Sequence, residues 1–145
     1  MNEVISITIS GPPTAWAAPF FTGKRGISPR FREKAKAVWE INQQYDSSII
    51  EGPVHLSITF RMPIPSSFSK KKKIQILKGE ILHTKKSDCS NLFKFAEDCL
   101  KGTVIKDDSQ VVSLQAKKEY HENPETIITV ILLQDSYAPQ ERHEP

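Results

Sequence analysis

Acidic side chains stand on both sides of one short amphipathic segment in the middle of the chain. Asp88 precedes this segment, and the pair Asp107 and Asp108 follows it, in the stretch DCSNLFKFAEDCLKGTVIKDD. Magnesium prefers hard oxygen ligands such as carboxylates, and phosphodiester hydrolysis needs such an ion to activate water and to stabilise the leaving oxygen. Lys94, between the acids, could pair with a phosphate. These residue types are typical of a metal-dependent nuclease site.

Spacing alone favours a simpler interpretation, in which Asp88 caps a helix and the later acidic pair forms an exposed turn. Other chemistries have less support, because GKRG at 23–26 lacks the spacing of a P-loop and neither HExxH nor GxSxG occurs. Cys89 and Cys99 are too few for a zinc cage and lie on or near one helix, so we expect no disulfide between them. They could act as nucleophiles, although buried helix cysteines are commoner.

The segment between the acids predicts a helix with one apolar and one polar face, at about 100° per residue. The apolar face consists of Leu92, Phe95, Ala96, Cys99 and Leu100. The polar face consists of Asn91, Lys94 and Asp98, with Glu97 beside them. Gly102 follows the last turn, where glycine favours a left-handed stop.

Alternating apolar residues predict three strands, at about 5–9, 54–60 and 112–116, and the apolar run TIITVILL at 126–133 predicts a fourth, more deeply buried strand. A further helix is expected from about residue 30 to 45. Its predicted apolar stripe consists of Phe31, Ala35, Val38 and Trp39. These elements predict an α+β fold, a single compact domain with a mixed sheet and two main helices.

We expect this domain to occupy residues 1–134. Within it, residues 11–29 form a Pro- and Gly-rich arm and residues 62–87 a lysine-rich loop, and residues 135–145 form a frayed tail. The composition, 38% hydrophobic and 26% charged, is normal for a soluble globular protein. No apolar run approaches the ~18 residues of a membrane span, and two cysteines fit a reducing cytoplasm. We therefore expect a cytoplasmic protein without a membrane partner.

The net charge of +3 is unevenly placed. Residues 70–86 hold seven lysines and one acid, and residues 24–36 hold six basic residues and one acid. Such clusters can bind a polyanion, although a solvated loop and a solvated helix face are the simpler explanation. The candidate DNA contacts are Lys70, Lys71, Lys72, Lys73, Lys85, Lys86, Arg25 and Arg30.

The stretch HTKKSDCSNLFKFAEDCLKGTVIKDDSQVVSLQAKKEY, residues 83–120, resembles the RusA family of Holliday-junction resolvases. In that family a basic stretch leads into Asp-x-Asp-Asn-Leu-x-Lys at a helix start. An acid, a glycine, an Asp-Asp-x-Gln turn and a strand with lysines follow. PIPSSFSKKKK and SPRFREKAKAVWEI extend the resemblance to about residues 3–133. It implies a RusA-like fold and a crossover junction endodeoxyribonuclease that resolves four-way DNA junctions by paired nicks, in recombination and repair. It also implies Mg²⁺ or Mn²⁺ as cofactor, a homodimer and no nucleotide cofactor.

The resemblance assigns a role to each matching residue. Asp88 and Asp108 match catalytic metal ligands of the family, and Asp107 is the neighbouring candidate ligand. The catalytic lysine and asparagine match Lys94 and Asn91.

The chain departs from the family where its second aspartate falls on Ser90, a neutral hydroxyl that could hold only a metal-bound water. The site could bind one metal where relatives bind two, or Asp98, Glu97 or Asp107 could substitute for the missing acid. Alternatively, the protein binds branched DNA with weak or no nuclease activity. We favour a working nuclease, because the rest of the family's catalytic set is present. A third hypothesis is an interaction module whose charges serve solvation only.

Overall fold

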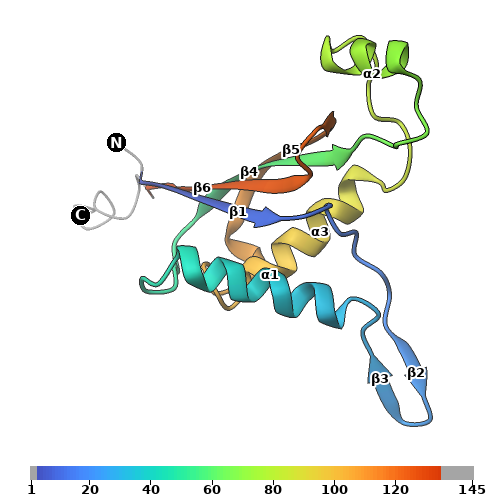
Figure 1. The fold of residues 1–145 in the computed structure, drawn as a ribbon. Helices are drawn as coiled ribbons and strands as arrows, with labels where there is room; N and C mark the ends of the chain where they lie inside the picture. The colour runs from blue at the N-terminus through green and yellow to red at the C-terminus, as the bar shows by residue number, and fades with distance from the viewer. Residues whose placement is uncertain (1–2, 135–145) are drawn as a thin grey trace, which may run out of the picture.

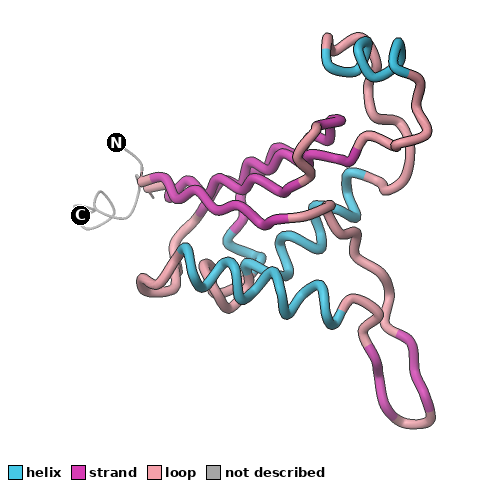
Figure 2. The backbone as a smooth tube through the Cα atoms, in the orientation of Figure 1, coloured by secondary structure: helices cyan, strands magenta, loops and turns pink. Residues whose placement is uncertain are grey.

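A four-stranded mixed sheet forms the centre of the computed structural model, which describes residues 3–134 (Figures 1 and 2). Its strands are β1 (Val4–Ser10), β4 (Val54–Pro63), β5 (Val111–His121) and β6 (Glu125–Leu132), in the spatial order β1-β6-β4-β5. β6 is antiparallel to β1 and to β4, whereas β4 and β5 are parallel. The four predicted strands and the mixed sheet are therefore confirmed.

Two helices, α1 (Phe31–Gln44) and α3 (Cys89–Leu100), lie against one face of this sheet (Figure 1). Alternate residues of β4 point toward them, because successive side chains of a strand face opposite ways. The core thus formed includes Leu56, Ile58 and Phe60 of β4, Ile128 and Val130 of β6, Ile41 of α1, and Leu92 and Leu100 of α3. The predicted single α+β domain with two main helices is confirmed.

The predicted apolar stripe of α1 is wrong for Phe31, Ala35 and Trp39, whereas Val38 packs against the core as predicted. Phe31 is 72% and Trp39 is 63% exposed, and Ala37 and Ile41 are the buried residues of this helix. The polar side chains beside Ala37 and Ile41 explain this orientation, because they find partners on the backbone of β1.

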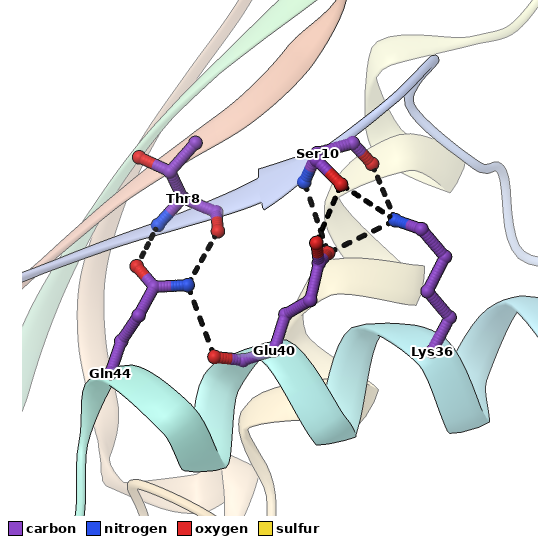
Figure 3. A network of polar contacts seen from close by, with 5 residues as sticks. All are labelled: Thr8, Ser10, Lys36, Glu40 and Gln44. Carbon is purple, nitrogen blue, oxygen red and sulfur yellow. Dashed lines mark hydrogen bonds and ion pairs between the residues drawn. The ribbon is translucent and has the colours of Figure 1, made fainter.

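Those partners lie on the outer edge of β1 (Figure 3). The Gln44 amide accepts from the Thr8 N–H at 2.8 Å and donates to the Thr8 carbonyl at 2.7 Å. The Glu40 carboxylate accepts from the Ser10 N–H at 3.0 Å, and Lys36 Nζ donates to the Ser10 carbonyl at 2.7 Å. Unpaired edge strands tend to recruit other strands, so side chains of α1 protect this edge.

Two segments that the sequence suggested were irregular contain regular structure. The arm at 11–29 includes a hairpin of β2 (Phe20–Thr22) and β3 (Arg25–Ile27), whose turn contains Gly23 at a φ of 66°. The predicted loop at 62–87 includes α2 (Lys70–Leu77).

Local chemistry accounts for α2. Ser69 caps it by accepting a hydrogen bond from the Lys72 N–H at 3.1 Å, and Ile76 is buried. Lysine has a high helix propensity, so a run of lysines is compatible with a helix as well as with a loop. Both α2 and the hairpin project from the body (Figure 1).

The expected tail at 135–145 lies outside the described residues. In the part of the chain that is described, no helix combines the length and apolar character needed to cross a membrane.

Candidate nucleic-acid and metal site

Helix α3 has the apolar face and the polar face that the sequence predicted. Its apolar face is buried, and Phe93 is buried with it. On the polar face, Lys94 is exposed, while Asn91, Glu97 and Asp98 are half-buried. Gly102 follows the helix with a φ of 86°, which confirms the predicted left-handed stop.

Asp88 occupies the N-cap position of α3, but its carboxylate makes no capping hydrogen bond. Only its backbone carbonyl takes part in the helix, accepting from the Leu92 N–H at 3.0 Å. The side chain is exposed. The helix therefore does not engage this carboxylate, which is free to meet a ligand.

The amino-terminal arm positions the first two turns of α3. The Trp16 N–H donates to the Asn91 carbonyl at 2.9 Å, and Lys94 Nζ lies 3.6 Å from the centroid of the Trp16 ring. Arg30 Nε donates to the Ala15 carbonyl at 3.0 Å and holds the arm beside α1. Sequence reasoning missed Trp16, although a tryptophan within a Pro-rich arm signals a packing contact.

Strand β5 holds the segment that enters α3. Lys118 Nζ donates to the Lys85 carbonyl at 2.6 Å and to the Ser87 carbonyl at 2.9 Å. The His83 ring lies 4.6 Å from that of Tyr120. The contact of Lys118 was not predicted, and the lysines that this strand shares with the family pattern were the feature of the sequence that could have indicated it. The carboxyl-terminal part of β5 thus lies beside the start of α3.

The second acidic pair lies at the other end of α3. Asp107 accepts from the Ser109 N–H at 3.0 Å and pairs with Lys101 at 3.3 Å. Hydrogen bonding to Ser109, followed by the pairing with Lys101, lowers the pKa of Asp107 to about 2. Asp107 therefore secures the turn, whereas the adjacent Asp108 is exposed.

Glu97 is a neighbour of Asp108. Burial raises the pKa of Glu97, and the carboxylates of Asp108 and Asp98 raise it further. Asp88 lies nine residues before Glu97, so about 13 Å of helix, at ~1.5 Å per residue, separates the two ends. Asp88 and Asp108 therefore lie toward opposite ends of α3.

The rest of the described chain does not supply a closed site either. Within residues 3–134, no group of three or more His, Cys, Asp or Glu side chains could hold a metal ion. The chemistry of Asp88 and Asp108 fits Mg²⁺, since both side chains are exposed oxygen donors. Within one chain, however, the two residues lie toward opposite ends of α3.

The candidate DNA contacts lie in three places. Lys70, Lys71, Lys72 and Lys73 form the first turn of α2, Lys85 and Lys86 precede α3, and Arg25 lies on the hairpin. Lys72 Nζ is 3.8 Å from the Phe68 ring centroid, and Lys73 Nζ donates to the Ser66 carbonyl at 3.4 Å. Arg30 is engaged with the arm, as described above. Lys70 and Lys71 are exposed, as are Lys85, Lys86 and Arg25, so these side chains are open to a phosphate.

Both cysteines are free thiols, as expected. Burial raises the pKa of Cys99 to about 12, so this thiol stays protonated and is a poor nucleophile.

Comparison with known proteins identifies the family. A family model described as endodeoxyribonuclease RusA matches residues 11–131. A Bacillus subtilis (strain 168) relative named uncharacterized protein YqaN is 33% identical over 137 residues, which covers 88% of this chain and 96% of the relative. The family match includes the arm, α2, α3 and β5, the elements that surround the site just described. The chain therefore belongs to the RusA family of endodeoxyribonucleases.

Proposed function

We propose that this protein is a divalent-metal-dependent endonuclease that resolves four-way DNA junctions by paired nicks, in recombination and repair. The observation that carries the proposal is the position of Asp88. Its carboxylate makes no capping hydrogen bond at the start of α3. Helix α3 begins on the side of the body from which the hairpin and α2 project (Figure 1). Both projections carry basic residues that could hold DNA while the acid acts on it.

The proposed chemistry assigns one role to each residue. Asp88 and Asp108 would supply carboxylate oxygens to Mg²⁺ or Mn²⁺, which prefer such ligands. When bound, such an ion lowers the pKa of a water molecule and offsets the charge on the leaving oxygen. Lys94 would pair with the scissile phosphate from its place over Trp16. Asn91 would orient a substrate oxygen through its side-chain amide.

DNA binding would depend largely on α2. Its first turn carries four lysines and no acid, at the end of a helix where unpaired N–H groups favour an anion. Contacts from these lysines to phosphates would be independent of sequence and sensitive to salt. A junction has approximate two-fold symmetry, and a symmetric homodimer would supply one site for each of two nicks.

Removing the acids tests the proposal. Asp88→Asn and Asp108→Asn each replace a charged ligand by a neutral one of the same size, so nicking of a four-way junction in Mg²⁺ should fall to background. Binding of the junction in chelator should stay near native. Asp46→Asn is the matched control, because Asp46 is exposed in the loop after α1, and it should nick normally.

Two outcomes would contradict the proposal. Near-native nicking by Asp88→Asn would mean that the site lies elsewhere. Tight junction binding without nicking by the native protein, in Mg²⁺ and in Mn²⁺, would favour a branched-DNA-binding protein, for which the neutral Ser90 is the available explanation.

A further inference from the structure

The hairpin of β2 and β3 projects from the body and carries exposed aromatic side chains (Figure 1). Every residue of both strands is exposed, Phe20 at 50% and Phe21 at 73%. The hairpin therefore has no core of its own, and an isolated two-stranded hairpin is only marginally stable in water. Apolar side chains gathered on one exposed projection indicate a binding surface.

The two phenylalanines lie on opposite faces of the hairpin. Successive side chains of a strand point to opposite sides. Phe20 therefore shares one face with its cross-strand partner Ile27, and Phe21 shares the other face with Gly26. A methyl group on Gly26 would lie 3.0 Å from Cε1 of Phe21, so the phenyl ring packs across this glycine. Each face of the hairpin thus presents one phenyl ring.

The charge of this segment favours a polyanion as the ligand. Residues 11–32 contain four basic residues and no Asp or Glu. Two of the basic residues are at the tip of the hairpin, where Lys24 belongs to the turn and Arg25 lies opposite Thr22, and both are exposed. Basic residues interleaved with aromatic ones are typical of surfaces that stack on nucleic-acid bases while they hold the phosphates.

Both ends of the hairpin are fixed beside the candidate site. Trp16 precedes the hairpin, and Lys94 Nζ lies 3.6 Å from the centroid of its ring. Arg30 follows the hairpin and donates from Nε to the Ala15 carbonyl at 3.0 Å. Phe20 comes four residues after Trp16, so at most about 14 Å of chain separates the two, at ~3.6 Å per residue. Since nucleotides of one strand rise about 3.4 Å each along a duplex, the rings reach a base within about four nucleotides of a phosphate at Lys94.

We propose that this hairpin is a wedge that enters the crossover of a four-way junction and stacks Phe20 and Phe21 on the base pairs at the ends of its arms. Two rings on opposite faces would stack on two different arms, while Lys24 and Arg25 hold phosphates. Insertion into a continuous duplex must first unstack a base step, whereas the crossover already interrupts the stack. The wedge would therefore select branched over linear DNA.

Phenylalanine has no hydrogen-bonding group in its side chain, and every base has a face on which a ring can stack. The wedge would therefore recognise the branch and not its sequence. The choice of a four-way junction rests on the proposed function, but the stacking itself needs neither a metal ion nor a nick.

A junction with 2-aminopurine at the crossover tests the wedge. Stacking on neighbouring bases quenches the fluorescence of this base, so a phenyl ring that separates it from its neighbour raises the signal. In chelator, the native protein should raise the fluorescence severalfold on the junction and leave it unchanged on a linear duplex of the same sequence. Phe20→Ala with Phe21→Ala should lose most of this rise. The double variant should also bind the junction about tenfold more weakly, with unchanged affinity for the linear duplex.

Two further variants show whether the aromatic rings themselves are responsible. Phe20→Tyr with Phe21→Tyr keeps two rings and should retain the fluorescence rise. Trp39→Ala is the matched control, since Trp39 is an exposed aromatic residue on α1, and it should behave as the native protein. A tyrosine variant that loses the rise as fully as the alanine variant, or an alanine variant that keeps it, would contradict stacking.

The fluorescence in chelator separates failure of this inference from failure of the proposed function. If the native protein nicks junctions in Mg²⁺ but gives no rise at the crossover, or an equal rise on linear duplex, the wedge is wrong and the nuclease proposal stands. If the rise depends on the two rings but the native protein nicks in neither Mg²⁺ nor Mn²⁺, the wedge stands and the nuclease proposal fails. A native protein that binds neither DNA would overturn both.

Discussion

The first turn of α2 allows a quantitative test of how this protein holds DNA. Lys70 and Lys71 are exposed, and within the described residues neither pairs with an acid. Lys72 and Lys73 are partly engaged with Phe68 and Ser66. Replacing Lys70 and Lys71 together with alanine should therefore remove two phosphate contacts and leave the fold of α2 in place, since alanine is the best helix former.

The expected size of the effect follows from counterion release. Each phosphate contact on duplex DNA contributes about 0.9 to the slope of log K against log salt, so the double variant should lose about 1.8 from that slope. Between about 50 and 200 mM salt, the native affinity should then fall about 12-fold further than that of the variant.

Fluorescence anisotropy of a labelled four-way junction in chelator measures this slope without cleavage. Lys106→Ala with Lys117→Ala is the matched control, since it removes the same charge from lysines already paired with Glu51 and Glu119, and its slope should change much less. An unchanged slope for the α2 variant would refute phosphate contact there and favour a solvated helix.

Three further changes probe the surroundings of α3. Ser90→Asp adds a carboxylate to the first turn, where a helix tolerates negative charge, and should lower the Mg²⁺ concentration for half-maximal nicking by roughly tenfold; a higher requirement would mean that another acid already fills this role. Trp16→Ala removes the ring beneath Lys94 and should slow nicking about two- to fivefold, the equivalent of ~0.5–1 kcal/mol, with little effect on junction binding and with recovery in Trp16→Phe. Burial lowers the pKa of His83, and the charge of Lys118 lowers it further. Between that lowered pKa and about 6.5, the unfolded chain binds more protons, so the free energy of unfolding should fall as pH drops through this range. Urea titrations at pH 7.5 and 5.5 should show a smaller loss for His83→Phe; an equal loss would assign it to other groups.

Periodicity predicted the elements whose pattern is set by burial. The alternation of β4 and the apolar face of α3 are both buried as expected, because each packs against the same core. The stripe of α1 was misassigned because Phe31 and Trp39 are apolar but exposed. Hydrogen bonds to the backbone of β1 orient α1. Such bonds cannot be predicted from the pattern of apolar side chains in the sequence.

The sequence was enough to name the residues of the candidate site, but not to predict how they lie relative to one another. Family-like spacing pointed to Asp88, Asn91, Lys94 and Asp108, but residue types do not reveal that α3 and β5 run in opposite directions. That direction depends on contacts such as the one from Lys118 to the Ser87 carbonyl. The distance between the two acids is therefore a property of the tertiary structure.

The hydrogen bonds that α1 makes to β1 close one edge of the sheet to strand addition. A chain with two open sheet edges has two sticky ends, so strand addition could continue indefinitely into a fibre. Gln44, Glu40 and Lys36 occupy the backbone groups of β1 that another strand would need. Three polar side chains on a surface helix would thus keep the sheets of separate chains from joining at this edge, and substituting them would risk polymerisation long before it unfolded the protein.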